Sequence, residues 1–549
     1  MSAVDLARDL YLLLAALGLN LAVGYAGQPV LGQGAFVAVG AYGTFLLAGT
    51  LPLGLAVLVA VAGAAGLGWL VAYGAARLHG AFLALGTWAL AWLAVAVLAA
   101  FPGRFGGEQG LLRAAPATLV SPSLGLSWRL TPRWHVAFAV LLCAGLVLVT
   151  RALGRGPLGL ELAALRQGPE AAASVGVRGA SLRRNALAAA AAFGALAGAL
   201  TGVLLGVVAP SSVAPLLSIQ LFVAVLIGGT ASPYGPIAGI ALVLLLPDRG
   251  RGVGLLTALL LVAALALRDP IRRRLPSWSR PPRREPEPAA LPVAERGGDV
   301  LLDASGLRKR YGGLAALDGV DLTLRAGEVH ALLGPNGSGK TTLLRVLAGA
   351  TAADGGRVVV GGRDVTALGQ EERVRAGVAR TFQDTVLFPG LDVRGNVAVG
   401  ARAVAGGSFA RTLLRTPSAR RDDARVAAAG ALALRDAELP PGAKPAELPY
   451  GEQRILQVAR AAATNATVLL LDEPAAGMSA AETARLATLL RALAGNGRAV
   501  LVVEHNVRFV SAVADRVTVL AAGRVLAEGT PDEVRADPAV REAYLGRPA

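Results

Sequence analysis

Two long tracts of this chain contain no charged side chain, and they constrain its fold more than any other feature. Residues 10–76 and residues 185–247 lack Asp, Glu, Lys and Arg altogether. A helix needs about 20 mostly apolar residues to cross a bilayer, and uncharged apolar runs of this length are rare in soluble cores. We therefore predict an all-α polytopic membrane domain in the N-terminal half.

The apolar half divides into nine stretches, several of them short or interrupted by Gly and Pro. They lie near residues 10–27, 30–49, 52–76, 80–101, 134–153, 185–208, 213–230, 233–247 and 253–268. We expect eight or nine crossings. The arginine-rich loop 151–184 is expected in the cytoplasm, because positively charged loops are retained there. Its segment 161–177 could form a short helix that docks on a soluble domain, although a solvated loop is an equally good interpretation.

The composition changes after the last apolar stretch. Residues 269–299 are rich in Arg and Pro, which is typical of a membrane-surface anchor that runs into an extended linker. From residue 300 onward the charged and amphipathic composition is that of a soluble domain. We predict a transmembrane domain over 1–268, a cytoplasmic linker over 269–299 and a soluble domain over 300–549.

The net charge of +16 does not indicate a nucleic-acid-binding protein. Much of the positive charge lies in arginine clusters beside apolar stretches, where the retention of positive loops on the cytoplasmic side of the lipid membrane explains it. The single cysteine, Cys143, lies in an apolar stretch and excludes an intrachain disulfide. The first residues show no pattern of a removable signal peptide.

The soluble half contains a phosphate-binding motif, which is the clearest indication of its chemistry. It consists of Gly334, Pro335, Asn336, Gly337, Ser338, Gly339, Lys340, Thr341 and Thr342, which fit G-x-x-x-x-G-K-[ST]. The apolar run 329–333 before it predicts a buried strand, and a helix is expected after it. In this context the backbone N–H groups can surround phosphates, Lys340 can reach the β- and γ-phosphates, and the Thr341 hydroxyl can bind Mg²⁺. We predict a site for a nucleoside triphosphate with Mg²⁺.

Five further residues could complete such a site. Tyr311 could stack on a nucleotide base, or could simply pack in its strand. Gln383 could bind Mg²⁺ or water. The apolar strand that ends in Asp472 and Glu473 offers one carboxylate for Mg²⁺ and a second that can accept a proton from an attacking water. His505, at the end of another apolar strand, could contact a γ-phosphate, although a lone histidine is more often structural.

Taken together, these motifs resemble an ATP-binding-cassette (ABC) ATPase, an α/β P-loop NTPase domain with a helical subdomain. The resemblance covers residues 300–549 and includes the segment from Leu448 to Gln453, which opens an amphipathic helix. It matches 334–342 to the Walker A loop, Gln383 to the Q-loop, Leu448, Gly451, Glu452 and Gln453 to the signature, Asp472 and Glu473 to Walker B, and His505 to the switch histidine. Two positions depart from the family. Pro449 replaces the usual signature serine, and 475–479 lacks the usual aspartate.

Finer details are similar to the LivG-type ATPases of branched-chain amino acid importers, while 24–36, 170–177 and 227–229 resemble their LivM-type permeases. The resemblance implies a fused permease–ATPase subunit of the inner or plasma membrane, with a cytoplasmic ATPase. It also implies a second permease, a second ATPase and an external solute-binding protein. The implied small-molecule substrates are leucine, isoleucine and valine; urea, short amides and other amino acids remain open. A homodimeric ABC exporter and a membrane-tethered regulatory ATPase are the alternatives.

Overall fold

The computed structural model describes residues 2–74, 80–112, 118–121, 126–129, 131–210, 215–244, 298–404 and 417–545. The chain divides into two compact units, which are taken here in turn. The first comprises Met1–Leu162 and Ala180–Pro281, and the second comprises Ala163–Gly179 and Pro282–Ala549. The second unit therefore includes a segment that lies, in sequence, between two helices of the first.

The first unit is built almost entirely of apolar helices. Its helices are α1 (Ala3–Asn20), which continues into a π-helix (Leu21–Tyr25), α2 (Gln33–Leu47), α3 (Leu53–Gly74), α4 (Ala81–Ala100), α5 (Pro102–Phe105), α6 (Pro132–Arg155), α9 (Gly179–Leu205), α10 (Pro215–Gly228) and α11 (Gly235–Leu244). Within the described residues, five helices are long and apolar enough to cross a membrane, and three apolar helices are shorter. These eight elements coincide with the first eight predicted stretches. The ninth, 253–268, lies outside the described residues.

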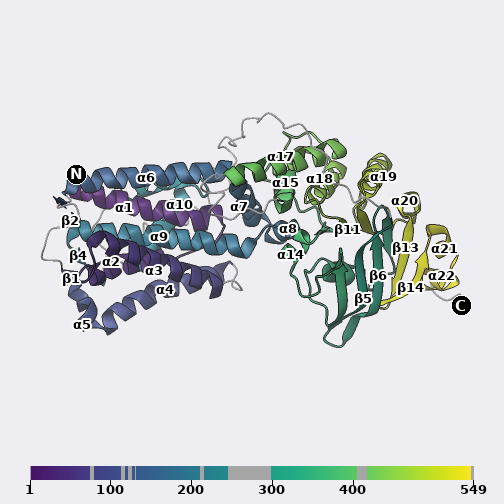
Figure 1. Cartoon of the computed structure of the whole chain (residues 1–549), viewed down its shortest axis with the longest axis horizontal. Coiled ribbons are helices and arrows are strands. Elements are labelled where there is room, and N and C mark those ends of the chain that lie inside the picture. Colours follow the sequence, from purple (N-terminus) through teal and green to yellow (C-terminus); the bar gives the residue numbers. More distant parts are fainter. Residues whose placement is uncertain are drawn as a thin grey trace. The chain divides into compact units, whose positions relative to one another are not determined.

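Small residues let these helices approach each other closely. A Cβ atom at Gly40 of α2 would overlap the carbonyl oxygen of Ala195, and one at Gly198 of α9 would overlap that of Val37. Such small-residue contacts are the usual way in which helices associate where lipid removes the hydrophobic driving force. α1 and α6 also run side by side (Figure 1). Helix packing therefore explains the glycines at these two positions.

A buried amide joins the end of α1 to the break between α10 and α11. Asn20 Nδ2 donates a 2.9 Å hydrogen bond to the Ser232 carbonyl, and Asn20 Oδ1 accepts one of 3.2 Å from the backbone N–H of Ala231. The helix has π geometry directly after Asn20. The side chain thus satisfies backbone groups that a broken helix leaves free, as buried polar groups in a membrane require.

The second unit contains a six-stranded sheet with the order β10-β11-β12-β7-β13-β14. Its strands are β7 (Val329–Leu333), β10 (Val378–Arg380), β11 (Val468–Asp472), β12 (Ala499–Val503), β13 (Arg516–Ala521) and β14 (Arg524–Gly529). All neighbouring pairs are parallel except β13 with β14. Every residue of β7, β11 and β12 is buried, as continuous apolar runs in a covered parallel sheet predict. The carboxyl ends of these three strands consequently lie together at one edge.

A second, antiparallel sheet and a group of helices complete this unit (Figure 1). The sheet has the order β6-β5-β8-β9, with β5 (Val300–Tyr311), β6 (Leu314–Arg325), β8 (Gly355–Val360) and β9 (Arg363–Asp364). The helices are α13 (Lys340–Leu347), α14 (Gln370–Arg375), α15 (Val393–Ala401), α17 (Pro417–Ala437), α18 (Tyr450–Ala462), α19 (Ala480–Gly495), α20 (Val507–Val513), α21 (Pro531–Ala536) and α22 (Pro538–Leu545). α15, α17 and α18 pack on one another and form a helical subdomain.

The predicted fold class is confirmed in both halves. Apolar helices form the first unit, and an α/β domain with a helical subdomain forms most of the second. The predicted linker falls almost wholly on residues outside the described part of the chain. Its division from its neighbours therefore stays a prediction.

Candidate nucleotide site

The loop between β7 and α13 has the backbone shape of a phosphate cradle. Gly334 has a φ of 146° and Gly339 one of 104°, values that residues with a Cβ rarely adopt. A Cβ on Gly334 would overlap the Leu520 carbonyl oxygen, and one on Gly339 would overlap that of Ala316. Glycine is thus required here both by backbone conformation and by the closeness of neighbouring chain. The loop ends at Lys340, the first residue of α13.

Lys340 is turned back onto its own loop. Its Nζ donates hydrogen bonds of 2.7 and 2.9 Å to the carbonyls of Gly334 and Pro335, and the side chain is 7% exposed. Burial lowers the pKa of the Lys340 ammonium, while the carboxylates of Glu473 and Asp472 act in the opposite direction. The Lys340 ammonium is thus held by two neutral carbonyl oxygens. A charged phosphate oxygen is a stronger acceptor and can replace them.

The loop also contains an unused donor. Ser338 Oγ is buried and has no hydrogen-bond partner among the described residues, although buried hydroxyls are normally paired. Ser338 is one of the residues that follow Gly334 in the motif, and its carbonyl accepts a 3.0 Å bond from Gly523 N–H. An unpaired hydroxyl, an ammonium and a helix N-terminus in one loop together suit a phosphate group.

The carboxyl ends of β11 and β12 bring the predicted acidic pair and histidine together. β11 and β12 are parallel, and Asp472 is level with Val503. Glu473 Oε1 lies 2.8 Å from His505 Nε2, and Glu473 Oε2 accepts a 3.0 Å hydrogen bond from Gln383 Nε2. Glu473 has a φ of 45°, a strained value for a residue with a side chain. Three residues that are distant in sequence thus meet at one carboxylate.

Asp472 is held separately from Glu473. Its Oδ2 accepts a 2.9 Å hydrogen bond from the guanidinium Nη2 of Arg380, and both side chains are almost fully buried. Arg380 was not among the residues that sequence reasoning selected. It precedes Gln383 by three positions, and no local pattern marks it, because its partner is 92 residues away.

The remaining predicted nucleotide residues differ in their exposure. Thr341 is exposed and Thr342 is partly buried at the start of α13. Tyr311 ends β5 and is 47% exposed, with the Lys309 ammonium 5.6 Å from its ring centre. Its assignment to base stacking therefore stays a prediction.

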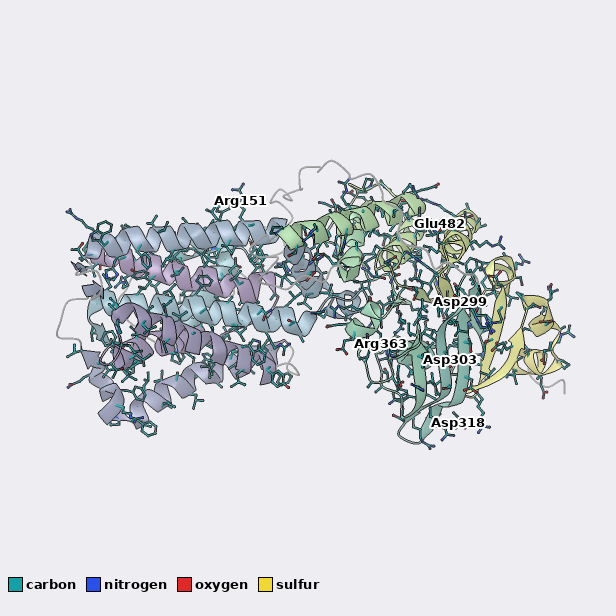
Figure 2. All side chains as sticks on the ribbon, in the orientation of Figure 1. Arg151, Asp299, Asp303, Asp318, Arg363 and Glu482 are labelled. Atoms are coloured by element: carbon teal, nitrogen blue, oxygen red, sulfur yellow. The ribbon has the colours of Figure 1, made fainter. Side chains whose placement is uncertain are left out.

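The signature segment forms the start of α18. Pro449 is the residue before the helix, and Leu448 and Gly451 are buried. A Cβ on Gly451 would overlap the carboxylate of Glu482, which Figure 2 labels at the start of α19. Gln453 Nε2 donates to the Leu448 carbonyl at 3.0 Å, and Glu452 lies 3.5 Å from Arg485. In the described chain, no hydrogen bond of these residues reaches the phosphate loop.

Three further side chains that the sequence did not single out support the site. Arg454 Nη1 donates to the Gln383 carbonyl, and Gln457 Nε2 donates to the carbonyls of Phe382 and Asp384 at 3.2 and 3.1 Å. The buried Glu504 accepts a 2.8 Å hydrogen bond from the Ala475 N–H, and burial raises its pKa. Arg454 and Gln457 of α18 thus hydrogen-bond the backbone carbonyls of Gln383 and of the residues on either side of it.

The segment 163–179 of the predicted cytoplasmic loop belongs to the second unit. It contains the end of α7 (Pro157–Gln167) and all of α8 (Pro169–Ala173). Gln167 Oε1 accepts a 2.6 Å hydrogen bond from Gly390 N–H, and Arg375 Nη2 donates to the Gly176 carbonyl at 2.8 Å. Glu371 Oε1 accepts a 3.0 Å bond from Gly179 N–H. Of the two interpretations of this loop, docking is therefore confirmed and a freely solvated loop is wrong.

Comparisons with known proteins cover both halves of the chain. Residues 6–267 match the family of the branched-chain amino acid transport system permease component. Residues 317–476 match the ABC transporter family, and residues 524–549 match the branched-chain amino acid ATP-binding cassette transporter family.

Individual proteins resemble the second half. The high-affinity branched-chain amino acid transport ATP-binding protein BraF of Pseudomonas aeruginosa is 36% identical over 249 residues, which are 45% of this chain and 98% of BraF. The corresponding protein LivG of Escherichia coli is 37% identical over the same shares. A crystal structure of a nucleotide-free ATP-binding cassette from an ABC transporter is 29% identical and covers 45% of this chain and all of its own, with a TM-score of 0.39.

Proposed function

Because the chain belongs to the family of branched-chain amino acid ATP-binding cassette transporters, we propose that it is a fused permease–ATPase subunit of an importer for these amino acids. It is a multi-pass membrane protein whose ATPase domain is cytoplasmic and hydrolyses ATP. The single observation that carries the proposal is that one chain joins a permease-family half to an ATP site with its acidic and histidine residues assembled. Leucine, isoleucine and valine are the proposed substrates.

We propose that residues 334–342 bind the triphosphate and that Tyr311 stacks on the base. Lys340 then exchanges the carbonyls of Gly334 and Pro335 for phosphate oxygens, which are stronger acceptors because they are charged. The unpaired Ser338 hydroxyl supports this assignment, since a phosphate oxygen in the loop would give it a hydrogen-bond partner.

The proposed metal ligands are Thr341, Gln383 and Asp472. Hydroxyl, amide and carboxylate oxygens are the donors that Mg²⁺ prefers, so the residues present fit this ion. Gln383 uses its Nε2 toward Glu473, which leaves its amide oxygen for the metal. When bound, Mg²⁺ neutralises charge on the phosphates.

The proposed general base is Glu473. It removes a proton from the attacking water, while Gln383 and His505 fix both of its carboxylate oxygens. The strained backbone of Glu473 supports this role, because strain of this kind concentrates at sites where geometry must be exact.

We propose that Leu448, Gly451, Glu452 and Gln453 complete the ATP site of a second ATPase subunit rather than that of their own chain. Their lack of hydrogen bonds to the phosphate loop, among the described residues, supports this. A second permease and an external solute-binding protein complete the assembly. Neither a homodimeric exporter nor a regulatory ATPase is favoured, because the permease half matches an importer family.

The hydrogen bonds of segment 163–179 suggest how the two activities are linked. Gly390, which bonds Gln167, follows Gln383 by seven residues in the same stretch of chain. Movement of Gln383 during ATP turnover is proposed to reach the membrane helices through α7 and α8. The functional division proposed for the chain is 1–268 permease, 269–299 linker and 300–549 ATPase.

Uptake in cells tests the proposed substrate. A host without its own branched-chain amino acid uptake would express this chain together with the second permease, the second ATPase and the solute-binding protein of the proposed assembly. Labelled leucine uptake is expected, with competition by excess isoleucine and valine and none by urea. Competition by urea or acetamide alone would overturn the amino-acid assignment while leaving the importer in place.

A further inference from the structure

A buried arginine holds the carboxylate that is proposed to bind the metal. Arg380 ends β10, and its Nη2 donates a 2.9 Å hydrogen bond to Asp472 Oδ2. The side chains of Arg380 and Asp472 are 7% and 3% exposed. Among the described residues, Arg380 is the ion-pair partner of Asp472. One carboxylate oxygen is thereby committed, and Oδ1 is left for another partner.

The backbone around this pair is fixed as well. β10 and β11 are paired in parallel, with Arg380 level with Leu470. The pairing continues one residue further, because Thr381 N–H donates to the Leu470 carbonyl at 2.9 Å and Thr381 Oγ1 accepts from Asp472 N–H at 3.3 Å. Arg380 and Asp472 therefore project from two strands that cannot shift independently.

We propose that Arg380 is a positioning residue for Mg²⁺ binding, because it fixes the rotamer of Asp472 so that Oδ1 faces the metal of a bound nucleotide. This rests on the proposed assignment of Asp472 as a metal ligand. A residue that hydrogen-bonds to a metal-ligating carboxylate sets the orientation of that carboxylate. Loss of such a residue weakens metal binding about 10–100-fold. A buried ion pair adds little net stability compared with apolar side chains of similar size. The effect that we attribute to this pair is therefore the orientation of the Asp472 carboxylate.

The arrangement of the arginine agrees with this role. Its Nε is buried without a partner in the described chain, and its guanidinium lies 5.5 Å from the centre of the Phe382 ring. The guanidinium is thus packed against an aromatic face, and within the described residues its hydrogen bond goes to Asp472. Phe382 directly precedes Gln383, so the chain that leaves β10 after Arg380 leads within three residues to another proposed metal ligand.

The test measures how much Mg²⁺ strengthens nucleotide binding, without turnover. The full chain carrying Glu473→Gln would be titrated with the fluorescent analogue trinitrophenyl-ATP, once in EDTA and once in excess Mg²⁺. The ratio of the two dissociation constants gives the contribution of the metal. Arg380→Met is expected to reduce that ratio about tenfold while leaving the affinity in EDTA unchanged.

Two further variants separate orientation from folding. Arg380→Lys keeps the charge but loses the planar fork, and should give an intermediate ratio. Arg357→Met removes the arginine of an exposed ion pair with Asp364 and should leave the ratio unchanged. If Arg380→Met does not fold, Arg380→Lys alone decides the question.

An unchanged ratio in the Arg380 variants would overturn the proposal, because the pair would then serve only the fold. A larger ratio would also overturn it, since Arg380 would then compete with the metal rather than orient its ligand. In a double-mutant cycle, Arg380→Met should have no further effect once Asp472→Asn is present. If Asp472→Asn itself leaves the ratio unchanged, the proposed metal assignment fails; if only the arginine variants leave it unchanged, this inference alone fails.

Discussion

The imidazole Nε2 of His505 lies 2.8 Å from Oε1 of Glu473. The two residues follow neighbouring parallel strands, β12 and β11, and the strained φ of 45° at Glu473 turns its side chain at the point where they meet. With Gln383 on the other carboxylate oxygen, the Glu473 side chain has one defined position. Such fixed placement is what a general base needs in order to act on one water molecule.

Replacing Glu473 by glutamine should stop hydrolysis and retain ATP binding. Glutamine has the same shape but cannot accept the proton, so phosphate release should fall by about 10²–10⁴-fold. Phosphate release and trinitrophenyl-ATP binding would be measured on the same preparation. Glu438→Gln, at a carboxylate that is 80% exposed, is the matched control and should hydrolyse normally. Hydrolysis at the wild-type rate in Glu473→Gln would remove Glu473 from the catalytic role.

Gly339→Ala should weaken nucleotide binding by at least about tenfold. The φ of 104° costs an alanine about 1–3 kcal/mol, and its methyl group would overlap the Ala316 carbonyl oxygen, so the loop must change shape. Binding of trinitrophenyl-ATP is the measurement. Gly442→Ala is the control, since a Cβ there meets no atom within 4 Å. Equal affinity in both variants would show that the loop conformation is not used for binding.

The phosphate loop and the buried strands around it could be predicted from the sequence because they depend on local patterns. The phosphate loop needs glycine at fixed places in one short stretch, and the buried strands that end in Asp472 and near His505 are continuous apolar runs. Parallel pairing then brings their carboxyl ends together. The pairing of Arg380 with Asp472 could not be predicted in this way. It joins positions 92 residues apart, and neither residue carries a local sign of the other.

Whether the cytoplasmic loop docks on the soluble domain could not be predicted from the sequence either. Segment 161–177 has a helix-forming composition, which suits both a solvated and a docked helix. Only hydrogen bonds between distant positions decide between them, such as the one from Gly390 N–H to Gln167 across 223 positions. The exposure of Tyr311 was likewise undetermined, because its strand neighbours are set by the antiparallel register of β5 with β6.

Gln167→Ala should uncouple transport from ATP hydrolysis. Removing the acceptor of the Gly390 N–H breaks one link between the loop and the stretch that carries Gln383. Labelled leucine uptake should fall several-fold, and basal ATPase activity of the purified chain should stay within about twofold of wild type. Gln109→Ala, at an exposed position of the other unit, should change neither quantity. An equal loss of uptake and basal hydrolysis would indicate damage to the ATPase itself.

Glu371→Gln should flatten the dependence of thermal stability on pH. Burial raises the pKa of Glu371, with Arg375 and Arg178 opposing. As pH rises above the ordinary glutamate value, the unfolded chain loses this proton first, so the native state binds more protons and stability falls until the raised pKa is passed. Glutamine can still accept the Gly179 N–H bond but has no charge to desolvate.

The measurement for Glu371 is the unfolding temperature of the whole chain in detergent between pH 4.5 and pH 8. The variant should lose less stability over this window and unfold about 2 °C higher than wild type at pH 7.5. Glu438→Gln, at an exposed carboxylate, should follow wild type. A variant curve parallel to that of wild type would contradict the raised pKa.

If ATP hydrolysis by this chain drives import, reconstituted vesicles will show accumulation that depends on it. The complete transporter would be placed in vesicles loaded with ATP, with the binding protein and labelled leucine outside. Wild type should accumulate leucine inside, whereas Glu473→Gln vesicles and vesicles without ATP should not. Accumulation that is equal with and without ATP, or unaffected by Glu473→Gln, would contradict the account.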